Sequence, residues 1–208
     1  SRAAFDALHR FARENGLLLF SDEVYRELEY DADTRLPAGC DQGENVVSLG
    51  VTSKAYGLPG LRIGWIATRN QEIYARMASI KDYTTICSSA PSEFLAELAM
   101  RKHHMLAQRN LDIVRSNLVV VDGFFERHAD LFQWVRPRAG SIGFPRLLRG
   151  DVEAFCAGLV ERAGVLLVPG PIFGDTGNHF RIGLGRRNLP QAVERLEEYL
   201  TDSSPAHD

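Results

Sequence analysis

Two short apolar segments, each followed closely by a charged residue, constrain the fold of this chain more than any other feature. The first, LLLF at 17–20, precedes Asp22, and the second, NVVSLGV at 45–51, precedes Lys54. Continuous apolar runs of this length are typical of strands that are buried on both faces of a parallel sheet. Ligands bind at the carboxyl ends of such strands in open α/β sheets. The sequence therefore predicts an α/β fold with Asp22 and Lys54 at the ligand-binding edge.

Helical periodicity accounts for most of the remaining chain. We predict helices over 3–14, 70–83, 88–103, 105–128, 151–164 and 189–200, and further strands over 61–69, 165–170 and 179–185. The long central helix can bridge two domains, and the order of elements changes after it. We therefore expect part of a large domain at 1–104, an interdomain helix at 105–129, a small α+β domain at 130–201 and a disordered tail at 202–208.

Composition narrows the range of partners. The chain has 208 residues, of which 45% are hydrophobic, and this is enough to bury a substantial core. A net charge of -3 implies no general attraction to nucleic acid or to an anionic membrane surface. The apolar runs are much shorter than the roughly 20 residues needed to cross a bilayer, and the N-terminus has no secretory leader. We expect a cytoplasmic protein without nucleic-acid or membrane partners.

Neither cysteine nor histidine spacing indicates a metal site. The three cysteines form no C-x-x-C pair, and we interpret them as reduced thiols. The histidines also lack the spacing of metal ligands, and we expect a structural or solvated role for four of them: His103, His104, His128 and His179.

Taken one at a time, the candidate site residues have ordinary interpretations. Asp22, at the end of a strand, needs a cationic partner because burial penalises an unpaired carboxylate; it also fits a simple turn or cap. Tyr25 fits a packed aromatic residue, and Lys54 a solvated lysine. The glycines near Arg62 match neither a P-loop nor a dinucleotide fingerprint. Arg181 alternates with apolar neighbours and so projects from the polar face of its strand.

Together, three motifs carry more information than their parts. SDEVY at 21–25, TSKAYGLPGLRIGW at 52–65 and HFRIGLGR at 179–186 resemble, in this order, motifs of the class I/II aminotransferases of fold type I pyridoxal-phosphate enzymes. The resemblance covers essentially the whole chain, as the C-terminal half to two-thirds of such an enzyme. It implies a large-domain remnant with a mostly parallel sheet, followed by the α+β small domain. It also implies pyridoxal 5'-phosphate as cofactor, amino acid and 2-oxo acid substrates, and a homodimer.

The resemblance assigns a role to each candidate. Lys54 would form the resting Schiff base and move the proton between the substrate Cα and the cofactor, since a lysine amine is nucleophilic once its pKa is lowered. Asp22 would keep the pyridine nitrogen protonated, and Tyr25 would hydrogen-bond the ring oxygen. Ser53 and Arg62 would hold the phosphate, with the glycines letting the chain turn back toward it. The substrate carboxylate would bind the last candidate, Arg181.

The chain departs from the family pattern in two respects, and two alternatives to transamination fit its residues. Many relatives have a serine where this chain has Val51, so the phosphate network is expected to be thinner. The family's upstream parts are not in this chain, so we expect weak cofactor binding by the chain alone. The same residues also suit elimination, replacement, cyclisation or decarboxylation. A third possibility is a non-catalytic chain that pairs with a partner.

Overall fold

The computed structural model describes residues 1–203, and its chain forms two compact units. Unit 1 comprises Ser1–Asn110 and unit 2 comprises Leu111–Asp208. The division lies within a single long helix, α4 (His103–Arg127), so that helix contributes residues to both units. The finer limits predicted for the domains stay predictions.

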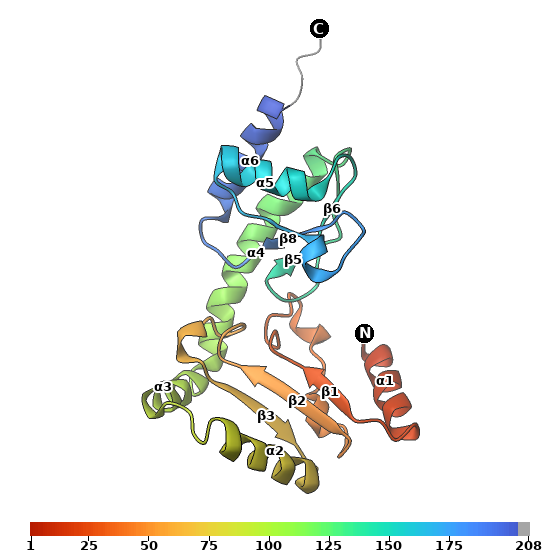
Figure 1. Cartoon of the computed structure of the whole chain (residues 1–208), viewed down its shortest axis with the longest axis vertical. Helices are drawn as coiled ribbons and strands as arrows, with labels where there is room; N and C mark the ends of the chain where they lie inside the picture. Colours follow the sequence, from red (N-terminus) through yellow and green to blue (C-terminus); the bar gives the residue numbers. More distant parts are fainter. Residues whose placement is uncertain (204–208) are drawn as a thin grey trace. The chain divides into compact units, whose positions relative to one another are not determined.

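Unit 1 combines a three-stranded sheet with helices (Figure 1). Its elements before α4 are α1 (Arg2–Glu14), β1 (Leu19–Asp22), β2 (Val46–Val51), β3 (Gly64–Thr68), α2 (Gln71–Thr84) and α3 (Ala90–Met100). Three short 3₁₀ turns lie in its loops: η1 (Ala32–Thr34), η2 (Gly39–Asp41) and η3 (Pro59–Leu61). The predicted elements of this region are all present, with ends that differ by a few residues.

The sheet of unit 1 has the strand order β1-β2-β3, with one parallel and one antiparallel pairing. Strands β1 and β2 run parallel, with Asp22 opposite Leu49, whereas β3 runs antiparallel to β2, with Gly64 opposite Val51. The carboxyl ends of β1 and β2 therefore lie at the same edge of the sheet. This is the edge at which the sequence places Asp22 and Lys54.

Burial of the first strand differs from the prediction. The segment LLLF was expected to be covered on both faces, yet Leu18 and Phe20 are each 55% exposed. Strand β1 lies at the edge of the described sheet and pairs only with β2, which itself is well buried at Val46 and Val47. The prediction of a strand was correct, and the prediction of its two-sided burial was wrong for this chain.

Local signals in the sequence define several helix ends. Asn70 caps α2 because its side-chain oxygen accepts the N–H of Ile73 at 3.0 Å. Asp151 caps the helix that follows it in the same way, accepting the N–H of Ala154 at 2.8 Å. That helix ends at Gly164, whose φ of 64° is left-handed and is readily adopted by glycine.

Unit 2 is an α+β arrangement of short antiparallel strands and two helices that follow α4. After α4 its elements are β4 (Phe132–Gln133), β5 (Ile142–Gly143), β6 (Arg146–Leu147), α5 (Val152–Ala163), β7 (Val168–Pro169), the 3₁₀ turn η4 (Gly170–Phe173), β8 (Phe180–Gly183) and α6 (Leu189–Ser203). One sheet has the order β5-β8-β7 and a second pairs β4 with β6. Strand β8, which carries Arg181, is thus the central strand of its sheet.

The core of unit 2 is a cluster of phenylalanines. Phe132 lies at its centre, with ring centroids 5.8 Å from Phe124, 5.5 Å from Phe125 and 5.8 Å from both Phe155 and Phe180. Such spacings are those of tilted and edge-to-face aromatic pairs. The cluster joins α4, α5 and β8, and so it fixes the strand that carries Arg181.

Helix α6 continues to Ser203, so the first two residues of the predicted tail are helical, and the rest of that tail, 204–208, lies outside the described residues. Within residues 1–203, no helix combines the length and the apolar character that a membrane crossing requires.

Candidate functional site

The structure brings the first two candidate motifs together at the carboxyl edge of the sheet in unit 1. Asp22 is the last residue of β1, and Lys54 follows the end of β2 by three residues. The N–H of Ala55 donates to the carbonyl of Val24 at 3.4 Å, which joins the two loops. The amine of Lys54 lies 5.9 Å from the ring centroid of Tyr25. Lys54 and Tyr25 are therefore neighbours, on loops that begin at adjacent strands.

Both charged groups at this edge are exposed. Lys54 is exposed to solvent, as is Asp22, whose Oδ1 accepts the N–H of Val24 at 3.1 Å. Because one of its oxygens makes only this local turn contact, the Asp22 carboxylate can still accept a hydrogen bond from a cationic ligand atom. The prediction that burial makes Asp22 require a cation was therefore wrong for this chain, because the carboxylate is exposed and water can solvate it.

The loop that carries Lys54 is closed by hydrogen bonds to a buried threonine. Thr52 has no exposed surface, and both its N–H and its hydroxyl lie 3.0 Å from the carbonyl oxygen of Ile63. The N–H of Leu58 donates to the carbonyl of Thr52 at 3.0 Å, and that of Gly57 donates to the carbonyl of Lys54 at 3.1 Å. Lys54 therefore projects from a loop whose backbone is bonded at both ends.

Helix α4 supports the same loop from outside it. The side-chain N–H of Asn110 donates to the carbonyl of Ala55 at 2.8 Å. A Cβ added to Gly57 would lie 2.8 Å from Asn110 Nδ2, too close for an undisturbed contact. Sequence reasoning missed both Thr52 and Asn110. Thr52 carried a weak signal as a hydroxyl at a strand end, whereas Asn110 carried none because it is distant in the sequence.

The turn between Lys54 and Arg62 differs in detail from the prediction. We attributed the reversal to the glycines, but of these only Gly57 has a left-handed φ, of 68°. The other left-handed residue is Arg62 itself, with a φ of 56°, at the end of η3. Its guanidinium is exposed and donates to the carbonyl of Pro59 at 3.2 Å. Ser53 is half-buried beside Lys54.

The last candidate, Arg181, belongs to unit 2. It is exposed on β8 between the buried residues Phe180 and Ile182, which confirms the predicted alternation. Its guanidinium carbon lies 5.0 Å from the ring centroid of Phe173, within the range of a cation-π contact. Arg181 is thus held against an aromatic ring of the same unit.

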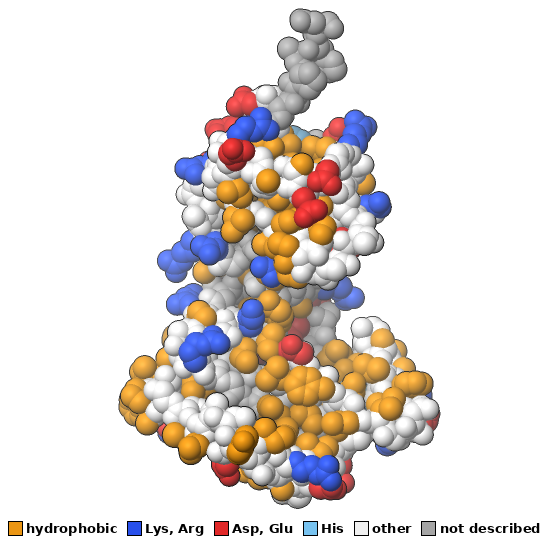
Figure 2. All heavy atoms as spheres, in the orientation of Figure 1, with side chains coloured by type: hydrophobic (Ala, Val, Ile, Leu, Met, Phe, Trp, Pro, Cys, Tyr) orange, Lys and Arg blue, Asp and Glu red, His pale blue; other side chains and the backbone are white. Residues whose placement is uncertain are grey.

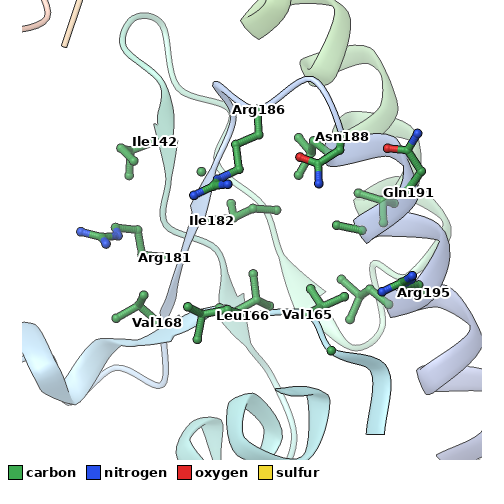
Figure 3. A pocket seen from close by; sticks show the side chains of 17 residues that line it. Ile142, Val165, Leu166, Val168, Arg181, Ile182, Arg186, Asn188, Gln191 and Arg195 are labelled. Carbon is green, nitrogen blue, oxygen red and sulfur yellow. The ribbon is translucent and has the colours of Figure 1, made fainter. Parts of the chain in front are cut away.

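Arg181 also lines a cavity of about 600 Å³ within unit 2. Two more arginines, Arg186 after β8 and Arg195 on α6, line it together with apolar side chains such as Val165 and Leu166 (Figure 3). Arginines that line a partly apolar cavity favour an anionic ligand, and carboxylates pair well with guanidinium forks.

The four histidines that we considered structural or solvated all have acidic neighbours. In unit 2, His128 contacts Glu197 at 3.3 Å and His179 contacts Asp175 at 3.0 Å. The hydrogen bonds from Arg127 hold the pKa of Glu197 below its ordinary value. Desolvation acts to raise the pKa of Asp175, but hydrogen bonds from His179 and from the Gly177 N–H outweigh it, and the pKa is lowered.

In unit 1, one carboxylate faces two histidines. Glu27 Oε1 lies 2.9 Å from Nδ1 of His103 and 3.7 Å from Nδ1 of His104, the first two residues of α4. Tyr56 packs beside them with an edge-to-face contact to His103. Burial, and then the Glu27 charge, raise the pKa of the Tyr56 hydroxyl. No spacing in the sequence indicated this group, since Glu27 and His103 are 76 residues apart.

Comparisons with known proteins agree on one family. The family "Aminotransferase class I and II" matches residues 1–196. Capreomycidine synthase of Streptomyces vinaceus is 32% identical over 202 residues, which cover 96% of this chain and 51% of that protein. Aspartate aminotransferase of Thermotoga maritima is 26% identical over 202 residues, covering 96% and 52%. The chain thus spans about half the length of these curated relatives.

Solved structures show the same fold. A PLP-dependent aminotransferase from Streptococcus suis aligns with a TM-score of 0.88 and 30% identity, over 97% of this chain and 53% of that chain. A PLP-dependent cyclase aligns with the same TM-score and identity, over 98% and 55%. The predicted fold type I architecture and pyridoxal-phosphate cofactor are confirmed by the family and by these structures.

The donor groups of unit 1 fit that cofactor. A ring nitrogen needs an acidic partner, an aldehyde needs an amine, a ring oxygen needs a donor, and a phosphate needs a cation. Asp22, Lys54, Tyr25 and Arg62 carry groups of these four kinds, and all four lie at or near strand ends of one unit.

Proposed function

The chain belongs to the class I and II aminotransferase family, and from this premise we propose that the whole protein transfers an amino group from an L-amino acid to a 2-oxo acid. The proximity of the Lys54 amine to Tyr25, at the strand edge where Asp22 ends β1, carries this proposal. Because the chain spans about half the length of its relatives, the proposal concerns the protein to which this sequence belongs.

Bound pyridoxal phosphate supplies an aldehyde and an electron-withdrawing ring that stabilises negative charge at an amino acid's α-carbon. Lys54 Nζ would hold the cofactor at its aldehyde and would move the proton to and from that carbon. The Asp22 carboxylate would accept a hydrogen bond from the protonated ring nitrogen, and the Tyr25 hydroxyl would donate to the ring oxygen. Thr52 and Asn110 act indirectly, because their hydrogen bonds to the backbone orient the Lys54 loop.

Anionic groups would be bound by the two arginines. The Arg62 guanidinium and the Ser53 hydroxyl would bind the phosphate, whereas the side chain of Val51 has no group that could donate to it. Arg181 binds the α-carboxylate that all amino acid substrates share, by a bidentate pair. Its contact with the Phe173 ring limits the rotation of the guanidinium and so orients it for this pair.

The lysine content of the chain permits a sharp test. The chain has three lysines, Lys54, Lys81 and Lys102. Pyridoxal phosphate is added, borohydride fixes any amine–aldehyde adduct, and the labelled peptides are measured by mass spectrometry. We expect label mainly at Lys54. Equal labelling of all three lysines would contradict the proposed role.

Activity gives the second test. Lys54→Ala should lower the release of oxo acid from a donor amino acid by at least the roughly 10²- to 10⁴-fold that general acid–base groups contribute. Lys81→Ala is the matched control, since Lys81 lies on α2 and contacts Thr85. A Lys54→Ala protein with unchanged turnover would overturn the proposal, and turnover by neither protein would favour a non-catalytic chain.

A second candidate is cyclisation of an amino acid with the same cofactor. It is favoured by capreomycidine synthase, whose 32% identity to this chain exceeds the 26% of the aspartate aminotransferase of Thermotoga maritima. The cyclase structure and the Streptococcus suis aminotransferase structure are equally similar to it, at 30%. The residues proposed above serve either reaction, because both require charge at the α-carbon to be stabilised. Conversion of a donor amino acid to its oxo acid supports transamination; a product of lower mass by one water, or an isomer, without oxo acid supports cyclisation.

We also propose that the whole protein is a cytoplasmic homodimer. Apolar side chains cover much of the displayed face of unit 1 (Figure 2), and exposed examples include Phe11, Tyr83 and Phe94. Patches of this kind mark surfaces that bind other protein segments. Sedimentation of the whole protein at several concentrations tests this, and a monomer throughout would contradict it.

A further inference from the structure

Beyond the proposed reaction, we propose that Glu27, His103 and His104 bind one divalent transition-metal ion of the zinc type. Each residue offers one ligand atom, and these three atoms all lie within 4.8 Å of one another. Two imidazoles and one carboxylate form a known zinc ligand set, in which water takes the fourth position. The site uses none of the residues assigned to the reaction, so a test of metal binding can fail without affecting the proposed reaction.

The distances suit a tetrahedral ion. With metal–ligand bonds of about 2.0–2.1 Å, neighbouring ligand atoms of a tetrahedral zinc site are about 3.3 Å apart. Glu27 Oε1 lies 2.9 Å from His103 Nδ1, slightly less than this separation, and 3.7 Å from His104 Nδ1, slightly more. The ring centroids of the two histidines are 3.8 Å apart, so the rings would have to separate on binding. The His104 side chain is 79% exposed and can turn to do so.

A simple hydrogen bond explains only part of this arrangement. The 2.9 Å contact of His103 with Glu27 is a hydrogen bond, but the 3.7 Å separation at His104 exceeds hydrogen-bond range. At Glu197, by contrast, an arginine already neutralises the carboxylate through two bonds of 2.9 Å. Within residues 1–203, the salt bridges of Glu27 are formed with histidines alone.

The backbone also holds Glu27 in an unusual conformation. Its φ is 77°, in the left-handed region that residues with a long side chain seldom adopt. The N–H of Glu27 donates to Glu29 Oε2 at 3.0 Å, and Glu29 pairs with Arg35 at 2.9 Å. Strained positions of this kind concentrate at binding sites. The Glu27 side chain is only 11% exposed, so its carboxylate is held toward the histidines.

The test measures metal binding by the untagged, metal-free chain. A chromophoric chelator competes for Zn²⁺ and gives the affinity and the stoichiometry, and Co²⁺ reports the coordination geometry by its visible absorption. We expect one ion per chain, tetrahedral absorption with Co²⁺, and no competition by Mg²⁺, which prefers oxygen ligands.

Variants identify the ligands. His104→Ala and Glu27→Gln should each weaken Zn²⁺ binding by at least the 10- to 100-fold that loss of a residue supporting a ligand typically costs. The control, His128→Gln, alters another histidine–carboxylate pair and should leave the affinity unchanged. Because His104 is exposed, its variant decides the question if Glu27→Gln does not fold. Absence of binding, or equal affinity in His104→Ala, overturns the proposal.

Discussion

Replacing Asn117 with alanine should destabilise unit 2 strongly for a single polar substitution. Asn117 is 3% exposed, and its side-chain nitrogen donates to the carbonyls of Leu184 and Arg186 at 2.8 and 2.7 Å. Leu184 has no exposed surface, so in the variant water does not replace the lost partner of its carbonyl. Leaving this buried acceptor without a hydrogen bond should lower the free energy of unfolding by about 1–3 kcal/mol. The Arg186 carbonyl keeps the N–H of Leu189 at 3.2 Å, so this loss is nearer about 0.5–1.5 kcal/mol. The sum is about 1.5–4.5 kcal/mol.

The two tryptophans make the measurement specific to one unit. Trp65 lies in unit 1, and Trp134 lies in unit 2, where it stacks on Phe125 and donates to Asp122. In a Trp65→Phe background, fluorescence during urea unfolding therefore reports on unit 2. Gln191→Ala is the matched control, because this exposed amide should change the free energy of unfolding by less than about 0.5 kcal/mol.

An aspartate at the same position adds a pH test of the reasoning. Asn117→Asp places a carboxylate against two carbonyl oxygens, which raises its folded-state pKa above the unfolded value and favours the protonated form. Its relative stability should therefore be highest at low pH and be lost as pH rises through the two pKa values. Two results would refute this reasoning. One is that Asn117→Ala and Gln191→Ala have the same free energy of unfolding, and the other is that Asn117→Asp becomes more stable as the pH rises.

Two further predictions concern unreactive and tightly packed positions. Burial raises the pKa of the Cys156 thiol to about 11. Thiol reagents at neutral pH should therefore modify the exposed Cys87 first and Cys156 only on unfolding. Peptide mapping measures the two rates of modification, and equal rates would contradict this prediction. Gly170→Ala should cost about 1–3 kcal/mol, because the added Cβ would lie 2.7 Å from the carbonyl oxygen of His179. Gly183→Ala, with no atom within 4 Å of its Cβ, should be nearly neutral in the same urea assay.

The fold was largely predictable because its signals are local. Apolar runs, helical periodicity and caps such as Asn70 depend on neighbours in the sequence, and the resulting elements agree with the structure within a few residues. The burial of β1 was not predictable in this way. A run of apolar residues indicates that a strand can be buried, but whether both faces are covered depends on which segments pack there, and Phe20 is largely exposed.

The residues of the candidate site also differ in how far the sequence predicts them. Lys54, Tyr25 and Asp22 could be proposed as candidates because motif order and strand ends are visible in the sequence. The groups that hold them could not, since Asn110 contacts Ala55 across 55 residues. Contacts of such separation arise only when the chain is folded, and no periodicity or spacing encodes them.

Helix α4 shows what these long-range contacts contribute. Asn110 and Asn117 lie about two turns apart on it. Asn110 donates its side-chain amide to a backbone carbonyl within unit 1, and Asn117 donates its amide to backbone carbonyls within unit 2. The acceptor in unit 1 is Ala55, next to Lys54, and the acceptors in unit 2 follow the strand that carries Arg181. Each amide binds a backbone carbonyl and not a side chain. It therefore limits the movement of the backbone while the charged side chain nearby, Lys54 or Arg181, stays exposed. One helix therefore supports the proposed amine-bearing loop and the proposed carboxylate-binding strand by the same chemistry.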